Sequence, residues 1–366
     1  YSCLYYTSGS SGQPKGVIHN HRNILHTAWS TAHYLRIQPD DRLAMLYTSG
    51  FAASMGSVFG ALTTGASCYP FDVKNDLAHL ARWLGEEQIT IFTGGPTLFR
   101  HLVLTLNQEM KFPHLRLVSL GGEAVLKSDF ELFKRYFADN CLFRHSLAGT
   151  EMQGVSTYII DKATEVADNV VPVGYPNEDK EVLLLDEDGN PVGIGEVGEI
   201  VVRSRYLAPG YWRRPELTQS KFNEDPEGGD KRLYWTGDLG RMHPDGCLYH
   251  LGRRDFQIKI RGFRVELEEV EAAVMEHPGI QEAAVLAHTR EGQDKRLVGY
   301  LVAAKDQPAP SAEELRIFLK KKLPDYMVPF GFVTLPAMPQ TPTGKVDRLA
   351  LPSLEEVFNL EKDFIA

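Results

Sequence analysis

The sequence contains few cysteines for its length. Four of its 366 residues are cysteine, at positions 3, 68, 141 and 247. No two of them have the spacing of metal ligands, and four cysteines in a chain of this length do not form a disulfide framework. We therefore expect reduced thiols and a cytoplasmic location.

An excess of positive charge and a long apolar run are also lacking. Aspartate and glutamate number 48 against 39 lysines and arginines, which gives a formal net charge of −9. This balance argues against a nucleic-acid-binding surface, which needs clustered positive charge. No apolar run is long enough to span a bilayer, and no signal peptide is recognisable. We therefore expect neither nucleic acid nor a membrane among the partners.

The chain does have the length and the apolar content for two domains. Helical and strand patterns alternate over residues 23–143, which predicts a mostly parallel α/β sheet whose ligands lie at the carboxyl ends of the strands. Short strands after residue 170 predict an antiparallel β region, open or closed into a barrel. We expect an α/β and α+β protein with a large lobe at 1–254, a small α+β domain at 255–352 and a tail at 353–366.

A loop rich in glycine and hydroxyl side chains lies near the start of the chain, where residues 6–17 read YTSGSSGQPKGV. Glycines let a backbone approach a ligand closely, and such a loop can wrap phosphate oxygens while a lysine adds positive charge. It is not the G-x-x-x-x-G-K-[ST] loop. A flexible linker is the alternative, but apolar runs on both sides predict two strands that hold the loop. The candidate phosphate-binding residues are Thr7, Ser8, Gly9, Ser10, Ser11, Gly12 and Lys15.

Thr150 and Glu151 end a second motif, SLAGTE at 146–151, which follows a predicted strand. A carboxylate beside a hydroxyl at a strand end suits Mg²⁺, which binds proteins through one or two carboxylates together with substrate phosphates. The alternative is an exposed loop glutamate, and from this motif alone that alternative is favoured.

Two further motifs place a charged side chain beside a glycine. In YWTGDLG at 234–240, the Asp238 carboxylate sits on a glycine turn and can accept hydrogen bonds from both ribose hydroxyls; a plain turn aspartate fits equally well. In PTGKVDR at 342–348, Lys345 lies on a loop that can reach into a closed site and stabilise charge on carboxylate and phosphate oxygens. A surface lysine is the alternative, and one lysine alone favours it.

Taken together and in this order, these motifs resemble those of the adenylate-forming (ANL) enzymes, which include acyl-CoA synthetases, luciferases and nonribosomal peptide synthetase adenylation domains. The run GRRDFQIKIRGFRVELEEVE at 252–271 is among the most specific signatures of that family, and LPDYMVP at 323–329 makes the chain most similar to an adenylation domain. The resemblance extends from Tyr6 to about Pro352. In the family a sizeable segment precedes the phosphate loop, so we expect the N-terminal part of the large lobe to be absent from the printed sequence.

The resemblance implies a reaction and two cofactors, ATP and Mg²⁺. A small-molecule carboxylic acid would react with ATP to give an acyl-adenylate, and the acyl group would pass to the phosphopantetheine thiol of a carrier protein. Lys345 would be catalytic, Thr150 would contact phosphate and Glu151 would hold the metal. Asp238 and Arg253 would bind ribose, and a small domain would turn about the hinge residue Asp255. Leu147 replaces the family's adenine-stacking aromatic, and Gly210-Tyr211-Trp212 with the preceding Glu199 is interpreted as structural.

The substrate pocket departs from the amino-acid pattern of the family. Ala52 stands where amino-acid-activating relatives have the aspartate that pairs with the substrate's α-ammonium. A buried ammonium without a carboxylate partner is costly, so we expect an acid without a free α-amine: an aryl or arylalkanoic, α-keto, α-hydroxy or fatty acid. Small side chains, Gly56 above all, predict room for a long or bulky acyl group, unless a backbone shift or the missing N-terminal part fills the space. The matched positions are Ala52, Ala53, Gly56, Thr93, Ser119, Gly121, Ser146, Gly154 and Val155.

Two alternatives stay open at this point. The chain could be an acyl-CoA or aryl-CoA synthetase that uses free coenzyme A, because no carrier-protein serine motif follows Pro352. It could also be a degenerate nucleotide-binding or scaffold module, which Leu147 and the missing N-terminal region favour. Lys345, Asp238 and Glu151 argue against that second alternative.

Overall fold

The computed structural model describes residues 1–7, 14–106, 112–253, 257–260, 263–288, 295–304, 308–339 and 346–352. Several predicted site residues lie outside these ranges, namely Ser8, Gly9, Ser10, Ser11, Gly12, Asp255 and Lys345. The described residues form two compact units, one within 1–7 and 15–255 and the other from residue 256 onward.

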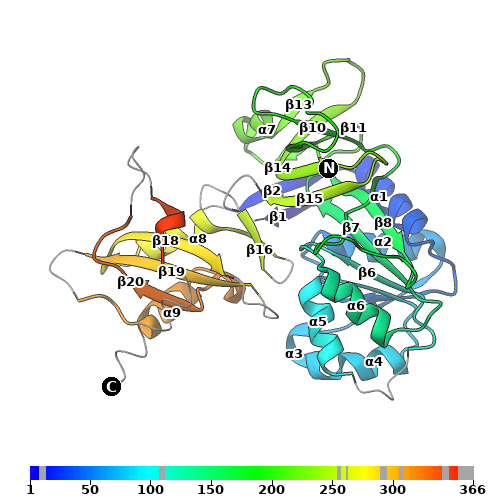
Figure 1. The fold of residues 1–366 in the computed structure, drawn as a ribbon, viewed down its shortest axis with the longest axis horizontal. Coiled ribbons are helices and arrows are strands. Elements are labelled where there is room, and N and C mark those ends of the chain that lie inside the picture. The colour runs from blue at the N-terminus through cyan, green and yellow to red at the C-terminus, as the bar shows by residue number, and fades with distance from the viewer. Residues whose placement is uncertain are drawn as a thin grey trace. The chain divides into compact units, whose positions relative to one another are not determined.

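A seven-stranded sheet is the centre of the first unit (Figure 1). Its strands follow the order β4 (Ser67–Pro70), β3 (Arg42–Met45), β5 (Ile91–Gly94), β6 (Leu117–Gly121), β7 (Leu142–Gly149), β8 (Gln153–Ile160) and β9 (Tyr175–Pro176). The pairs from β4 to β7 are parallel, whereas β7–β8 and β8–β9 are antiparallel. This confirms the predicted mostly parallel sheet.

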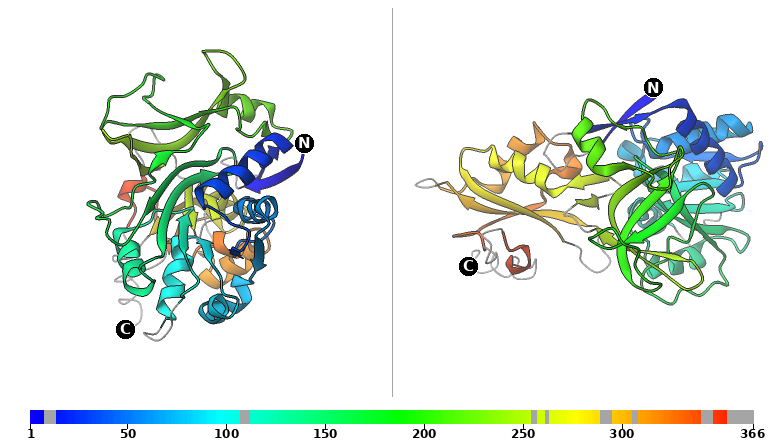
Figure 2. Two further views of the ribbon diagram at one scale, coloured as in Figure 1. Left: turned by 90° about the vertical axis from the view of Figure 1, so that its right-hand side faces the viewer. Right: turned by 90° about the horizontal axis from the view of Figure 1, so that it is seen from above.

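Two apolar cores show that helices cover both faces of this sheet (Figure 2). One core joins Phe92, Val118 and Phe143 of the sheet to the helices α4, α5 and α6. The other joins Leu43, Ile91 and Leu117 to α2 and to the end of α1. The elements are α1 (His21–Tyr34), α2 (Ala53–Thr64), α3 (Val73–Asp76), η1 (Leu77–His79), α4 (Leu80–Glu86), α5 (Pro96–Leu104) and α6 (Lys127–Tyr136).

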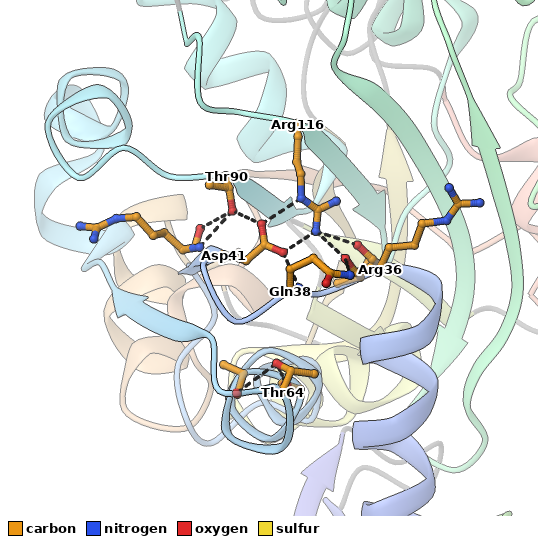
Figure 3. A network of polar contacts seen from close by, with 10 residues as sticks. Arg36, Gln38, Asp41, Thr64, Thr90 and Arg116 are labelled. Carbon is orange, nitrogen blue, oxygen red and sulfur yellow. Dashed lines mark hydrogen bonds and ion pairs between the residues drawn. The ribbon is translucent and has the colours of Figure 1, made fainter.

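A network of polar contacts around Asp41 ties together the segments that begin the parallel strands (Figure 3). The buried Asp41 carboxylate accepts hydrogen bonds from the Arg116 guanidinium at 2.5 and 2.9 Å and from Thr90 Oγ1 at 2.6 Å. It also accepts the Gln38 backbone N–H at 2.7 Å. These residues precede β3, β5 and β6, so the network fixes the starting points of three neighbouring strands.

The glycine-rich loop lies between two paired strands, as its flanking apolar runs predicted. Strands β1 (Cys3–Thr7) and β2 (Lys15–His19) are antiparallel, and Thr7 pairs with Lys15. A third strand, β12 (Gly210–Tyr211), pairs with the other side of β2. The Trp212 backbone N–H donates to the Gly16 carbonyl at 2.7 Å. The loop is therefore anchored at both of its ends.

An antiparallel sheet of five strands completes the first unit. It contains β10 (Glu181–Leu185), β11 (Val197–Ser204), β13 (Phe222–Glu224), β14 (Arg232–Met242) and β15 (Leu248–Arg253), with α7 (Pro215–Lys221) beside it. The order is β10–β11–β14–β13, and β15 pairs with β14. No pairing between the described strands joins β10 to β13, so the region is an open sheet and not a barrel.

The second unit is a small α+β structure. Its elements are β16 (Gln257–Ile260), β17 (Phe263–Glu266), α8 (Leu267–Met275), β18 (Ile280–His288), β19 (Arg296–Ala303), α9 (Ala312–Lys320), η2 (Asp325–Met327), β20 (Gly331–Thr334) and η3 (Arg348–Ala350). Strands β18 and β19 are antiparallel, and β20 runs parallel to β19. Ser311 and Glu314 form a capping box at the start of α9.

One predicted strand boundary was wrong, and one helix was missed. Strand β7 continues to Gly149, so Ser146 lies within a strand and not after one, because the antiparallel partner β8 extends the pairing of β7. Helix α2 was not predicted. All four cysteines are free, as expected. Among the described helices, none combines the length and the apolar character needed to traverse a bilayer.

Candidate active site

The folded chain brings Lys15 and Glu151 together, although 135 residues separate them in the sequence. Lys15 begins β2, Glu151 follows β7, and the Lys15 Nζ lies 3.5 Å from Glu151 Oε1. The two residues are only 6% and 1% exposed. This burial excludes the exposed loop glutamate considered above. A buried cation and a buried carboxylate thus meet at one end of the glycine-rich loop.

Tyr211 is a member of the same cluster that the sequence interpretation missed. Its hydroxyl donates to Glu151 Oε1 at 2.9 Å, and the Lys15 Nζ lies 4.9 Å from the centre of its ring. The Gly210-Tyr211-Trp212 motif was interpreted as structural, so this contact with the predicted metal ligand adds a role in the site. The signal available in the sequence was the hydroxyl of Tyr211 within a motif shared with the family.

His19 packs beside this cluster and was also missed. The side chain is fully buried, and its Nδ1 lies 3.2 Å from Asn23 Nδ2. Burial lowers the pKa of His19 to about 4, against an opposing effect from the negative charge of Glu151. The imidazole is therefore neutral at physiological pH, and the Glu151 carboxylate has Lys15 as its nearby positive charge.

Thr7 is the last residue of β1, and Thr150 lies in the turn after β7, directly before Glu151. Thr7 is opposite Lys15 in the β1–β2 pair. Among the described residues its buried Oγ1 has no hydrogen-bond partner, which suits a side chain whose partner is a bound ligand. Thr150 is partly buried, and its backbone carbonyl accepts from Gln153 Nε2 at 3.0 Å.

Asp238 and Arg253, the two predicted ribose ligands, face each other on neighbouring strands. They are paired residues of β14 and β15, and Arg253 Nη1 donates to Asp238 Oδ1 at 3.1 Å. His250 Nε2 lies 3.3 Å from the same oxygen. Asp238 is 6% exposed. It therefore lies inside a paired strand and not on a turn, because β11 and β15 pair with β14 on both sides.

Glu199 holds the backbone next to Asp238. The Gly237 N–H donates to Glu199 Oε1 at 2.9 Å, and Gly237 has a positive φ of 77° that a side chain would strain. The Thr236 hydroxyl accepts from the Asp238 N–H at 2.9 Å. The prediction of a structural role for Glu199 agrees with these contacts.

The predicted pocket residues fall on adjacent elements of the first unit. Thr93 of β5 pairs with Ser119 of β6, and Gly121 of β6 pairs with Ser146 of β7. The buried Ala52 precedes α2, and Gly56 and the exposed Ala53 lie within α2. Gly154, which is partly buried, and Val155 lie on β8. Val155 and Leu147 belong to a buried apolar cluster, so neither residue presents an exposed wall.

Gly56 does not open a space, which contradicts the reason given for a roomy pocket. A Cβ built on Gly56 would lie 2.9 Å from Thr31 Oγ1 in α1. A Cβ on Gly60, one turn further along, would lie 3.3 Å from Thr31 Cγ2. The glycines therefore allow α1 and α2 to pack closely. The position is filled by α1 of the same unit, and not by the missing N-terminal part that the alternative interpretation named.

Arg144 is a polar residue of this region that no sequence motif indicated. Its Nη1 donates to Ser119 Oγ at 2.9 Å and to Ser146 Oγ at 3.1 Å, and its Nη2 donates to Thr157 Oγ1 at 3.0 Å. Burial lowers the pKa of Arg144 to about 10, so the guanidinium still carries its charge at neutral pH. Two of its three partners are predicted pocket residues.

The described residues fit Mg²⁺ only as a phosphate-bridged ion. They contain no group of three or more histidine, cysteine, aspartate or glutamate side chains able to hold a metal. Glu151 supplies one carboxylate, which is the protein share that Mg²⁺ commonly takes when phosphate oxygens and water complete its octahedron. Such an ion would be held mainly by the nucleotide.

Two family models match this chain. The family model described as "AMP-binding enzyme" matches residues 2–212, and the model of the "AMP-binding enzyme C-terminal domain" matches residues 269–345. Gramicidin S synthase 1 of Brevibacillus brevis is 34% identical over 366 residues, which cover 99% of this chain and 32% of that synthase. A dimodular nonribosomal peptide synthase of Bacillus subtilis is 36% identical over 360 residues, which cover 96% of this chain and 15% of that protein. The chain therefore spans a third or less of the length of these relatives.

Two solved structures share the fold over most of the chain. The first is NpsA-ThdA, an artificially fused adenylation–PCP di-domain from Klebsiella oxytoca, with a TM-score of 0.77 and 27% identity over 90% of this chain and 64% of that one. The second is an o-succinylbenzoate CoA synthetase from Bacillus subtilis, with a TM-score of 0.83 and 25% identity over 95% of this chain and 68% of that one.

Proposed function

The chain belongs to the family of AMP-binding enzymes, and from this premise we propose that it activates a carboxylic acid with ATP as an acyl-adenylate. In this reaction an acid oxygen attacks the α-phosphorus of ATP, the bond from that phosphorus to the bridging oxygen breaks, and pyrophosphate leaves. The observation that carries the proposal is the buried Lys15–Glu151 contact at the end of the glycine-rich loop.

The nucleotide would be held by groups on the first unit. Lys15 and the hydroxyl of Thr7, which has no hydrogen-bond partner among the described residues, are suited to phosphate oxygens. When Mg²⁺ is bound, it neutralises phosphate charge, and Glu151 is the carboxylate that would hold it. Arg253 donates to the Asp238 carboxylate, and Glu199 accepts from the neighbouring Gly237 N–H. The Asp238 carboxylate is thereby held in a position suited to accept hydrogen bonds from ribose hydroxyls.

The second half of the reaction is transfer of the acyl group to a thiol. We infer a carrier-protein phosphopantetheine as the acceptor, because the chain resembles adenylation domains, one of which was solved fused to a PCP domain. Free coenzyme A is the second candidate, since a CoA synthetase shares the fold. Movement of the 255–352 domain about Asp255 would let Lys345 leave before the thiol enters.

The acid is proposed to lack a free α-amine. The buried Ala52 occupies the position where amino-acid-activating relatives carry the aspartate that pairs with the ammonium. Without that carboxylate an ammonium would be desolvated and unpaired. Aryl or arylalkanoic, α-keto, α-hydroxy and fatty acids remain as candidates, although the Gly56–Thr31 packing removes the reason given above for a large pocket.

The test is ATP–pyrophosphate exchange with a panel of amino acids and amine-free acids, on the full-length protein. We expect exchange with an amine-free acid, and we expect Lys345→Ala to lower it by about 100-fold or more because charge stabilisation in the transition state is lost. Lys320→Ala, which changes an exposed lysine of α9, serves as the control.

Two results would contradict parts of the proposal. Exchange with α-amino acids alone would refute the substrate class while leaving the reaction intact. No exchange with any acid, under conditions where the protein is folded and binds ATP, would favour the degenerate nucleotide-binding module.

A further inference from the structure

We propose that Arg144, with the hydroxyls of Ser119, Ser146 and Thr157, forms a subsite for a second, negatively charged group of the acid substrate, such as a distal carboxylate. This inference rests on the proposed function, because it assumes that an acid binds beside these strands. It adds the chemical class of that acid.

The cluster is built from three neighbouring strands. Arg144 and Ser146 lie on β7, Ser119 on β6 and Thr157 on β8, and the three hydrogen bonds from the guanidinium are 2.9 to 3.1 Å long. Ser119, Ser146 and Thr157 are all buried. The guanidinium is therefore fixed in one place, as a binding group must be.

Arg144 has no acidic partner among the described residues. Its hydrogen bonds are the three to hydroxyls, and its Nε is buried without a partner. Arg144 is partly buried, and a charge partly removed from water without a counter-charge is unfavourable. Elsewhere the chain supplies one, since Arg100 pairs with Asp129 at 2.6 Å and Arg203 with Asp225 at 2.7 Å. A negatively charged group on the ligand would supply the counter-charge of Arg144 in the same way.

The three hydroxyls strengthen this selectivity for an anion. Each accepts a hydrogen bond from Arg144, so each keeps its own O–H as a donor. Within the described ranges these three O–H groups meet no acceptor. Together with the unpartnered Nε–H, the cluster offers several donors and one positive charge, and no acidic oxygen. Such a set recognises carboxylate better than amide, alcohol or ammonium groups.

The cluster also lies where the acid is expected. Ser119 and Ser146 are predicted pocket positions, and Thr93, a third, is paired with Ser119 on β5. The buried Ala52 means that the pocket lacks the carboxylate of an amino-acid site. Loss of one negative side chain and presence of one positive side chain act in the same direction, because both disfavour an ammonium and favour an anionic substituent.

The experiment uses pyrophosphate exchange with acids of equal chain length that end in methyl, carboxylate, carboxamide or ammonium groups. We expect the highest kcat/KM for the dicarboxylic acid. Arg144→Gln should lower the ratio of dicarboxylic to methyl-ended acid by about 10- to 100-fold, the range for a lost charged hydrogen bond. Arg144→Lys should restore part of that ratio. Arg135→Gln, an exposed arginine on α6, should leave the ratio unchanged.

A binding measurement separates recognition from catalysis. Calorimetric titration of the unaltered full-length protein with the dicarboxylic acid alone should show binding that Arg144→Gln weakens by a similar factor. The subsite would be refuted, while exchange itself continues, by either of two results. The kcat/KM ratio of dicarboxylic to methyl-ended acid could be near one in the unaltered protein, or Arg144→Gln could leave that ratio unchanged. An equal fall in kcat/KM for every acid would show that Arg144 only stabilises the fold. Absence of exchange with all acids would instead refute the proposed function.

Discussion

Two arginines beside the same parallel sheet have opposite surroundings. Arg116 lies just before β6 and makes two hydrogen bonds to the buried Asp41 carboxylate (Figure 3). Arg144 lies on the neighbouring strand β7 and contacts three hydroxyls and no described carboxylate. The described residues supply a counter-charge to the first arginine and none to the second.

This difference separates a structural arginine from a candidate ligand-binding one. Around Asp41, every partner is a group that must be in place for three strands to begin at the right residues. Around Arg144, the partners satisfy hydrogen bonds but not charge. A charge without a counter-charge does not help the protein to fold. Such a charge is typical of a functional site, where a ligand supplies the missing charge. Each of the following predictions tests whether the two arginines really differ in this way.

The largest expected effect is on stability at the compensated site. Asp41→Ala should lower the free energy of unfolding by about 3 kcal/mol, because it leaves Arg116 without its counter-charge and leaves two further donors without their acceptor. Urea unfolding monitored by circular dichroism would measure the change. Asp40→Ala, at an exposed neighbouring aspartate, is the control. A change below about 1 kcal/mol for Asp41→Ala would mean that the network is not needed for folding.

A smaller effect is expected from acid. Burial raises the pKa of the Asp41 carboxyl, but hydrogen bonds from Arg116, Thr90 and Gln38 outweigh burial, and the net pKa lies below its ordinary value of 3.8. The resulting stabilisation is present above that ordinary value and is lost as pH falls through the lowered pKa. The difference in unfolding free energy between the unaltered protein and Asp41→Asn should therefore shrink below about pH 4. A difference that is constant from neutral pH down to about pH 3 would contradict this.

The smallest expected effect is on stability at the uncompensated site. Arg144→Leu should change the free energy of unfolding by less than about 1 kcal/mol, since removal of an unpaired charge offsets the loss of three hydrogen bonds. The same urea titration would measure it. A loss comparable to that of Asp41→Ala would erase the distinction between the two arginines and assign both to the fold.

Much of the fold was predictable because the relevant patterns are local. Alternating helix and strand patterns correctly predicted the parallel sheet, and Ser311 followed by Glu314 marked the start of α9. Helix α2 was missed because its sequence, ASMGSVFGALTT, is rich in glycine and threonine, which are poor helix formers. Its stability comes from packing against Thr31 of α1, a contact that no local pattern shows.

The candidate site was likewise predictable only in part. Motifs named Lys15, Glu151 and Asp238, and the fold buries all three. Motifs could not name Arg144, because a single arginine in a strand carries no signal and its three hydroxyl partners come from three different strands. The pairing of Glu151 with Tyr211 was likewise invisible, since only the folded backbone brings residues 60 positions apart into contact.

The pairing of β12 with β2 has a consequence for folding during synthesis. Val17 and Ile18 acquire their neighbours Tyr211 and Gly210 only after nearly two hundred more residues have been made. At typical synthesis speeds that interval is roughly 10–40 s. Until then one edge of β2 lacks its native partner strand. Its unpaired backbone groups can pair with other chains and favour aggregation or chaperone binding. Nascent chains halted before β12 should therefore lack ATP affinity, even with the entire glycine-rich loop already synthesised.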